Sequence, residues 1–260
     1  MPKYQTADQK SHHPLHQELA FQLLEPGLVS IGLTITPQQK HAVAEHFALI
    51  TETNRVTNLT TVTDWETALT RHFLDSLSIL LALNGINTLP AAPRLLDIGT
   101  GAGFPGIPIK IFCPNFQVDL VESRKKKGAF LEKVIKSLKL HDTRVYAERA
   151  ESLAHGSLRE SYDVVVSRAV APLNTLVELC LPFVRIGGVF IAMKHLNVGE
   201  EIQESLTAVE KLGGAISMPP LEVDLPNLLP KRALVLVKKI SPSPNELPRT
   251  AGIPQKRPIK

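Results

Sequence analysis

Residues 97–106 combine a carboxylate with closely spaced glycines, a pattern typical of loops that bind a nucleotide-like cofactor. They read Asp97-Ile98-Gly99-Thr100-Gly101-Ala102-Gly103-Phe104-Pro105-Gly106 and follow an apolar run. Glycine permits a tight turn and a close approach of the backbone to a ligand, and a helix N-terminus offers free N–H groups. We therefore expect this segment to bind a cofactor where a strand turns into a helix.

The identity of the cofactor depends on the acidic residues around the glycines. Gly101, Gly103 and Gly106 fit the dinucleotide fingerprint G-x-G-x-x-G, and a ribose-binding acid belongs at the end of the next strand. Asp97 would repel the pyrophosphate of NAD but favour the cationic S-adenosylmethionine, directly or through water. The pattern thus favours S-adenosylmethionine over an NAD-dependent oxidoreductase, with cofactor-binding candidates Asp97, Gly99, Gly101, Gly103 and Glu122.

The elements around this loop alternate between strands and helices. The expected strands are 94–98, 117–122, 143–147, 162–167, 188–194, 215–223 and 232–239. Helices are expected to begin near Phe104, Arg124, Glu148 and Leu173, and one more spans 200–212. Repeated strand–helix units predict an α/β, Rossmann-like fold with a seven-stranded, mostly parallel sheet and helices on both faces.

Four regions are expected along the chain. Residues 1–34 form an N-terminal extension, with a short helix at 15–24 that ends before Pro26, and residues 35–90 form a helical region. Thr36-Pro37-Gln38-Gln39 has the form of a capping box, and Asp64 can cap a second helix. Residues 91–240 form the cofactor-binding domain, and residues 241–260 are expected to be an extended, basic, Pro-rich tail.

Composition limits the other possibilities. The 260 residues are 43% hydrophobic and 21% charged, and no apolar run is long enough to cross a membrane. The first residues carry no apolar leader, so a cytoplasmic location is expected. Cys113 and Cys180 stand far apart without a histidine cluster, which predicts neither a disulfide nor a metal site. The net charge is +4, and basic residues are concentrated at 124–139 and 249–260, which indicates a nucleic-acid partner.

Four separated segments resemble the RsmG (GidB) family of small-subunit ribosomal RNA guanine-N7 methyltransferases. One is the glycine loop with its continuation Phe104-Pro105-Gly106-Ile107-Pro108. Another comprises Asn58-Leu59-Thr60 and Arg71-His72-Phe73-Leu74-Asp75-Ser76-Leu77. The remaining two are Ser167-Arg168-Ala169-Val170-Ala171-Pro172-Leu173 and 248–258. The resemblance spans roughly Ile35 to Pro258 and leaves the first thirty or so residues and the link near Pro226 unexplained.

The resemblance implies a methyl transfer from S-adenosylmethionine to guanine N7 in small-subunit (16S) ribosomal RNA, free or in an assembling subunit. It places cofactor contacts on Gly99, Phe104, Ala150, Glu151 and Arg168. Three of these have structural alternatives, since Phe104 can be a core residue, Glu151 a surface residue and Arg168 the partner of a nearby acid. If Arg168 lies in the site, it faces the cofactor's carboxylate or an RNA phosphate.

The candidate RNA contacts come from the resemblance and from the basic segments. They are Asn58, His72, Arg124, Lys125, Arg168, Arg249, Lys256 and Arg257. His72 and Asn58 are equally compatible with a structural role. The two basic surfaces, 124–139 and 249–260, are expected to flank the cofactor crevice and to contact RNA phosphates. No cofactor contact is expected from 249–260.

No acid–base catalytic residue is expected. The D/N-P-P-Y segment that exocyclic amine methylation uses is absent after the fourth strand, and neither cysteine is placed as a nucleophile. Guanine N7 already has an exposed lone pair, so alignment alone is sufficient. A non-catalytic RNA-binding module with the same fold is the other alternative, which the intact glycines and Asp97 disfavour.

Overall fold

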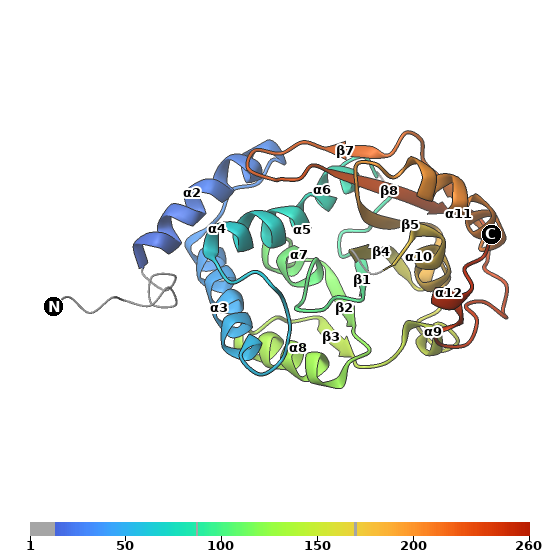
Figure 1. Ribbon diagram of the computed structural model, residues 1–260, viewed down its shortest axis with the longest axis horizontal. Coiled ribbons are helices and arrows are strands. Elements are labelled where there is room, and N and C mark those ends of the chain that lie inside the picture. Colours follow the sequence, from blue (N-terminus) through green and yellow to red (C-terminus); the bar gives the residue numbers. More distant parts are fainter. Residues whose placement is uncertain (1–13, 87, 169–170) are drawn as a thin grey trace.

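A single mixed sheet with helices on both faces forms the centre of the protein (Figure 1). The computed structural model describes residues 14–260 except 87 and 169–170. The strands are β1 Arg94–Ile98, β2 Gln117–Val121, β3 Thr143–Tyr146, β4 Tyr162–Arg168, β5 Val184–His195, β6 Gly214–Ile216, β7 Leu221–Val223 and β8 Arg232–Lys239. In these residues no helix is both long and apolar enough to cross a membrane.

The strand order is β3-β2-β1-β4-β5-β8-β6, and β7 also pairs with β8. Strands β1 to β5 all run parallel to one another, whereas β8 runs antiparallel to its neighbour β5. The carboxyl ends of β1 to β5 therefore share one edge of the sheet, which the start of β8 joins because Arg232 pairs with His195. The order reverses between β1 and β4, and open α/β sheets bind ligands at such a reversal.

The helices divide between the two faces. One face carries α2 Pro14–Ser30, α3 Pro37–Asn54, α4 Trp65–Ala68, a π-helical segment Leu69–Leu74, α5 Asp75–Leu77, α6 Ile79–Leu83, α7 Gly106–Phe112 and α8 Lys125–Ser137. The other carries α9 Ala150–Leu153, α10 Leu173–Cys180, the 3₁₀ turn Leu181–Phe183 and α11 Gly199–Lys211. The short α12, Ile253–Lys256, contacts α10.

Alternation along the strands creates two apolar cores. Leu95 packs into the core with the N-terminal helices, whereas its neighbour Leu96 packs into the core with α10 and α11. Val164 and Val165 divide in the same way, because successive side chains of a strand point to opposite faces. This burial on both faces explains why apolar residues follow one another directly in the central strands, as Leu95-Leu96 and Val164-Val165-Val166 do.

The expected fold is confirmed, with corrections at three places. The Thr36–Gln39 capping box and the Asp64 cap are formed. The expected strand 215–223 is wrong, because Pro219 and Pro220 interrupt it and two short strands, β6 and β7, each pair with β8. The sheet therefore has eight strands.

The first helix also differs from expectation, since α2 continues through Pro26 to Ser30. Phe21, Leu24 and Leu28 on its two halves are all buried in the core, and this packing offsets the hydrogen bond that proline cannot donate. The N-terminal extension is thus part of the folded core from α2 onward.

Residues 241–260 are the third correction, because they are not an extended tail. The segment folds back on α9 and α10 and ends in α12 (Figure 1). Arg159 donates hydrogen bonds to the carbonyls of Ser243, Pro244 and Leu247, and His155 contacts the carbonyl of Pro248. These contacts satisfy backbone groups that a proline-rich segment cannot pair in a helix or strand.

Candidate functional site

The glycine loop turns sharply from β1 into α7 and is attached to β2. Gly99, Gly101 and Gly103 have φ values of 75°, 61° and 97°, which are accessible to glycine without strain. The N–H groups of Gly99 and Thr100 donate to the carbonyl of Val121, at 2.9 and 3.2 Å. The loop is therefore held against the end of β2 with its backbone close to the sheet edge.

Asp97 lies underneath this loop and is completely buried. Its Oδ2 accepts a hydrogen bond of 2.8 Å from the N–H of Gly106, the first residue of α7. Its Oδ1 has no hydrogen-bond partner among the described residues, and burial raises the pKa of this carboxyl to about 6. Asp97 thus fixes the start of α7 from below, and its direct contact with a cofactor stays a prediction.

Gly106 is required by this arrangement. A Cβ there would come within 2.4 Å of Leu120 Cδ2 and 3.1 Å of Asp97 Oδ2. A Cβ at Gly103 would come within 2.5 Å of Ile107 Cγ1. Both glycines allow close packing of the loop, and neither lines the cavity beside it.

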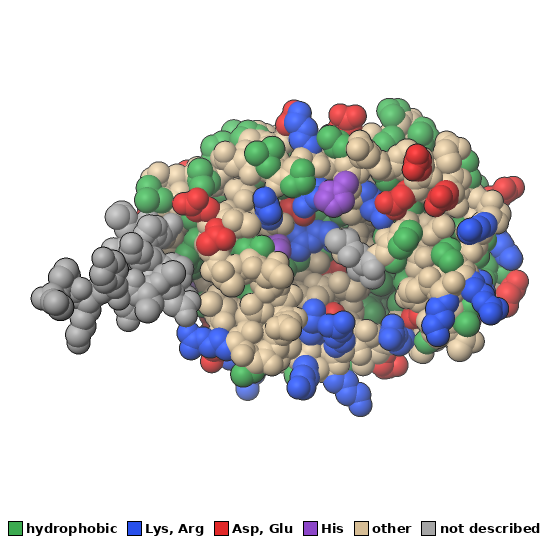
Figure 2. Space-filling view, in the orientation of Figure 1, with side chains coloured by type: hydrophobic (Ala, Val, Ile, Leu, Met, Phe, Trp, Pro, Cys, Tyr) green, Lys and Arg blue, Asp and Glu red, His purple; other side chains and the backbone are tan. Residues whose placement is uncertain are grey.

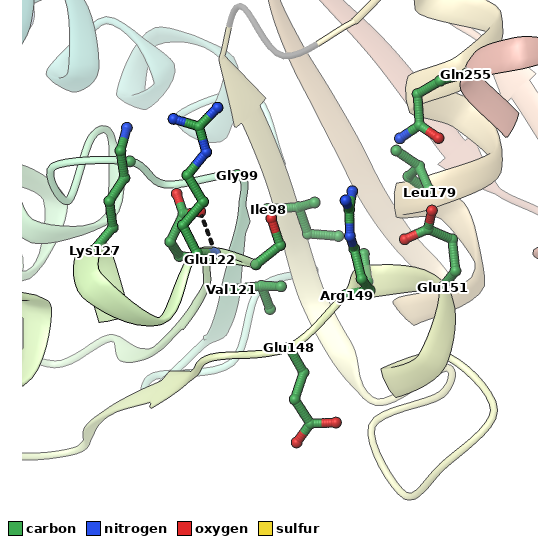
Figure 3. A pocket seen from close by; sticks show the side chains of 14 residues that line it. Ile98, Gly99, Val121, Glu122, Lys127, Glu148, Arg149, Glu151, Leu179 and Gln255 are labelled. Carbon is green, nitrogen blue, oxygen red and sulfur yellow. Dashed lines mark hydrogen bonds between the residues drawn. The ribbon is translucent and has the colours of Figure 1, made fainter. Parts of the chain in front are cut away.

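A cavity of about 340 Å³ opens beyond the carboxyl ends of β1 and β2 (Figure 3). Five of the residues expected to bind a cofactor line it: Gly99, Gly101, Glu122, Ala150 and Glu151. Arg124, expected as an RNA contact, lines it as well, together with Lys127, Arg149 and Gln255. The cavity therefore brings together residues that lie far apart in the sequence, such as Gly99 and Gln255.

Glu122 lies directly after β2, where the sequence pattern predicts a ribose-binding acid. It follows β2, is 7% exposed, and accepts a hydrogen bond of 2.8 Å from the N–H of Arg124 to its Oε1 (Figure 3). This bond orients the carboxylate at the beginning of α8. A carboxylate has a second oxygen, which can accept hydrogen bonds from vicinal hydroxyls of a ligand.

The wall opposite Glu122 comes from α9 and the C-terminal segment. Glu151 Oε1 accepts a hydrogen bond of 2.9 Å from the N–H of Gly252, just before α12. Gln255 on α12 reaches the cavity next to Leu179 (Figure 3). We expected no cofactor contact from the C-terminal segment, and this stays a prediction; the structure places Gln255 of this segment in the wall of the cavity.

Phe104 and Arg168 lie on the other side of the glycine loop and do not line this cavity. The Phe104 ring stacks on His72 and His46, with centroid distances of 4.7 and 5.1 Å. The guanidinium of Arg168 lies 5.2 Å from the centre of the same ring and contacts Asp75 at 3.2 Å. Phe104 thus makes core contacts and Arg168 pairs with an acid, which are the structural alternatives that the sequence left open for them.

His46 on α3 is a site-adjacent residue that sequence reasoning missed. It is completely buried, and its Nε2 donates a hydrogen bond of 2.8 Å to the carbonyl of Ala102 in the glycine loop. Burial lowers the pKa of His46 to about 4, so the ring is neutral. The signal in the sequence was its place on the apolar face of α3, between Val43 and Ile50.

The candidate RNA contacts have different surroundings. Asn58, Lys125, Lys256 and Arg257 are exposed. His72 is half-buried, its Nε2 lies 2.9 Å from Thr60 Oγ1, and burial, with the nearby charge of Arg168, lowers its pKa to about 4. Their binding of RNA stays a prediction.

Arg249 is engaged within the protein rather than presented to solvent. Its Nε and Nη2 donate to the two carboxylate oxygens of Glu178 at 2.8 and 2.6 Å, and the Glu178 side chain is fully buried. Its Nη2 also donates to the carbonyl of Arg257. This geometry favours a structural role in holding the C-terminal segment.

Solved structures support the fold. The protein MtNAS in complex with MTA and tNA superposes with a TM-score of 0.51 at 18% identity, covering 78% of this chain and 74% of that one. A protein from Corynebacterium glutamicum superposes with a TM-score of 0.50 at 16% identity, covering 85% and 98%. At these identities the likeness concerns the fold alone.

Sequence relatives are much closer. Proteins named ribosomal RNA small subunit methyltransferase G are 41% identical over 234 residues in Dehalococcoides mccartyi and 44% identical over 232 residues in Roseiflexus castenholzii. The alignments cover 90% and 88% of this chain and 97% and 96% of those proteins. The family model described as rRNA small subunit methyltransferase G matches residues 39–221. This chain belongs to the rRNA small subunit methyltransferase G family.

Proposed function

We propose that this protein transfers a methyl group from S-adenosylmethionine to N7 of a guanine in small-subunit (16S) ribosomal RNA. Membership of the family supports the reaction class. The observation that carries the proposal is the cavity at the ends of β1 and β2, where the backbone of Gly99 and Gly101 faces the acid Glu122. An rRNA substrate, free or in an assembling subunit, would place the protein in the cytoplasm.

The cavity fits this cofactor in size and in the groups that it offers. Its volume of about 340 Å³ is within the range of small-molecule sites. Glu122 would accept hydrogen bonds from the ribose, the glycine backbone would lie against the amino-acid part, and Ala150 and Glu151 would border the adenine. The bound cofactor supplies an electrophilic methyl group on a sulfonium ion.

The protein's own contribution to the chemistry is alignment. Guanine N7 carries an in-plane lone pair and no proton, so its attack needs no general base. Holding the two reactants in line can supply roughly 7 to 11 kcal/mol of the barrier. We therefore assign no acid–base catalytic residue. Phe104 and Arg168, which contact each other beside the glycine loop, would help to position the reactants.

RNA would reach the site along basic side chains. Arg124 lines the cofactor cavity and Lys125 begins α8 beside it, so both are placed to contact phosphates of an RNA lying over the site. Lys256 and Arg257 extend this surface from the opposite wall. Such contacts position RNA without reading its sequence, and a base unstacked from a loop or junction can then enter the pocket.

A titration distinguishes this proposal from its rivals. Calorimetry should show binding of S-adenosylmethionine and no binding of NAD at the same concentrations. Small-subunit RNA incubated with the protein and methyl-labelled cofactor should then acquire label. Binding without any transfer to naked RNA or to assembling subunits would favour the non-catalytic RNA-binding module, and preferential NAD binding would contradict the proposal.

A further inference from the structure

A second cavity of about 340 Å³ lies on the other side of the glycine loop, at the carboxyl ends of β4 and β5. Its lining includes Arg71, His72, Asp75, Arg168, His195 and Arg232. Lys and Arg side chains gather around the centre of the visible face in Figure 2. Arg232, at the start of β8, belongs to none of the sequence motifs described above.

Asp75 is the centre of this cavity's charge arrangement. It is 1% exposed, and its two oxygens accept from two arginines: Oδ2 from Arg168 at 3.2 Å and Oδ1 from Arg232 at 3.1 Å. The side chains of these arginines are only 16% and 17% exposed. The single carboxylate of Asp75 therefore forms ion pairs with two poorly solvated guanidinium groups.

The other charges compensate this positive excess only in part. Asp97, under the glycine loop, interacts electrostatically with Arg168. Lys194 and Glu201, which also line the cavity, form an ion pair with each other. Arg71 adds another positive charge at the exposed rim. Because removing a charge from water is costly unless an opposite charge replaces the solvent, the cavity is suited to an anion.

Arg232 has donors available for such an anion. Its Nε donates to Asp75, and its Nη1 donates to His195 Nδ1 at 3.1 Å. Among the described residues no acceptor is bonded to Nη2 of Arg232 or of Arg168. The two guanidinium groups are thus held from one side by a shared carboxylate, and each keeps N–H groups that can bind a phosphate.

The position of the cavity connects it with the methyl transfer. Arg168 covers the ring of Phe104, a residue of the same loop that contributes Gly99 and Gly101 to the cofactor cavity. The two cavities therefore flank the reversal of strand order between β1 and β4. A methyl acceptor must lie beside the methyl donor, and this second cavity is the adjoining space.

We propose that the second cavity binds the phosphate of the RNA nucleotide that is methylated, with Arg232 as its principal ligand. The proposal rests on the proposed function, since it assigns the anion to that reaction's substrate. Asp75 is a positioning residue that sets the direction of both guanidinium groups. Arg232 then fixes the nucleotide so that its base faces the cofactor.

The test uses guanosine 5′-monophosphate and guanosine as probes for the full-length protein saturated with S-adenosylhomocysteine, so that the cofactor cavity is filled. We expect the wild-type protein to bind the monophosphate at least fivefold more tightly than the nucleoside. Arg232→Gln should reduce this ratio to near one, and Arg232→Lys should restore part of it. Lys231→Gln is the matched control, because it removes the same charge from an exposed neighbour paired with Asp224.

Arg232→Gln leaves Asp75 paired with Arg168, so the fold should persist, and thermal unfolding of both variants checks this. A phosphate preference that is absent in the wild type, or equal in Arg232→Gln and Lys231→Gln, would overturn the assignment. If Arg232→Gln is unfolded, the same comparison is made with Arg232→Lys, in which an undiminished ratio would overturn it. Methylation of RNA by the wild-type protein is measured separately, so failure of the proposed function is distinguishable from failure of this site.

Discussion

The contact between Arg249 and Glu178 should control the cofactor cavity from a distance. Arg249 holds the C-terminal segment on α10. That segment supplies Gln255 to the cavity wall, and its Gly252 N–H donates a hydrogen bond to Glu151 of the same wall. Arg249→Ala removes the guanidinium but keeps the backbone N–H that also donates to Glu178 at 2.9 Å. The substitution should therefore loosen the segment without deleting it.

The loss of stability caused by Arg249→Ala can be calculated from the burial of the Arg249–Glu178 ion pair. Removing one partner of a buried ion pair costs about 3–5 kcal/mol. The Arg249 side chain is 31% exposed, so water can reach part of the vacated space, and we expect a loss of about 2–3 kcal/mol. At roughly 2–4 °C per kcal/mol for a domain of this size, Tm should fall by about 4–12 °C.

The same substitution should reduce the free energy of cofactor binding by less than it reduces the stability of the fold. Loosening the segment removes the hydrogen bond between Gly252 and Glu151 and displaces Gln255. A single hydrogen bond contributes about 0.5–1.5 kcal/mol, which corresponds to a Kd raised about two- to tenfold. Calorimetry with S-adenosylmethionine, well below both melting temperatures, measures this change.

Two controls make the result decisive. Lys260→Ala removes an exposed charge from the same segment and should change neither quantity. Glu178→Gln combined with Arg249→Ala removes the unpaired buried charge and should recover part of the lost stability. If Arg249→Ala lowers Tm but leaves the Kd for S-adenosylmethionine unchanged, the C-terminal segment has no part in the cofactor site, and our reasoning is refuted.

Three further substitutions test other parts of the site. Gly99→Val should weaken S-adenosylmethionine binding tenfold or more, whereas Gly32→Val, at a φ of the same 75° far from the cavity, should not; equal Kd values by calorimetry would exclude the loop as a cofactor site. Buried His46 should make the protein less stable as pH falls from 6.5 to about 4, because the unfolded chain binds a proton on this residue more readily than the folded chain. The difference in free energy of unfolding between wild type and His46→Gln should therefore decrease by up to about 1.4 kcal/mol per pH unit over this range. A difference that does not change with pH would contradict a neutral His46 ring. Lys125→Gln should lower the slope of log RNA affinity against log salt by roughly 0.7, whereas Lys211→Gln on α11 should not; equal slopes would remove Lys125 from the RNA surface.

The sequence predicts the parts of the fold that depend on local patterns. The strands 94–98 and 232–239 have the expected bounds, because each is an apolar run with clear turn signals on both sides. Thr36 caps α3 because a side-chain oxygen, a proline at the first helical position and Gln39 all occur within four residues. Local physics is sufficient for such elements.

The differences arise where distant residues decide the conformation. Pro26 is a local signal to end a helix, but burial of the apolar residues around it keeps α2 intact. The fold of residues 241–260 depends on the pairing of Arg249 with Glu178, which lies 71 positions earlier, and no periodicity reveals it. Local patterns therefore predicted an extended tail.

The candidate site divides in the same way. Gly99, Gly101 and Glu122 could be named because a strand, a glycine loop and an acid at the next strand end occur in a fixed order. His46 and Arg232 could not be named, because each reaches its place only through packing of α3 or the pairing of β8 with β5. For His46, the one local indication in the sequence is its position on the apolar face of α3.

The most direct test of the central claim is a map of methylated guanosine in small-subunit ribosomal RNA from cells with and without this gene. Mass spectrometry of nuclease fragments identifies the methylated atom as well as the nucleotide. We predict one 7-methylguanosine that disappears without the gene and returns when the purified protein and S-adenosylmethionine are added to the unmodified subunit or its RNA. An unchanged map, or a methyl group lost from N1, N2 or a carbon atom instead of N7, would contradict the account.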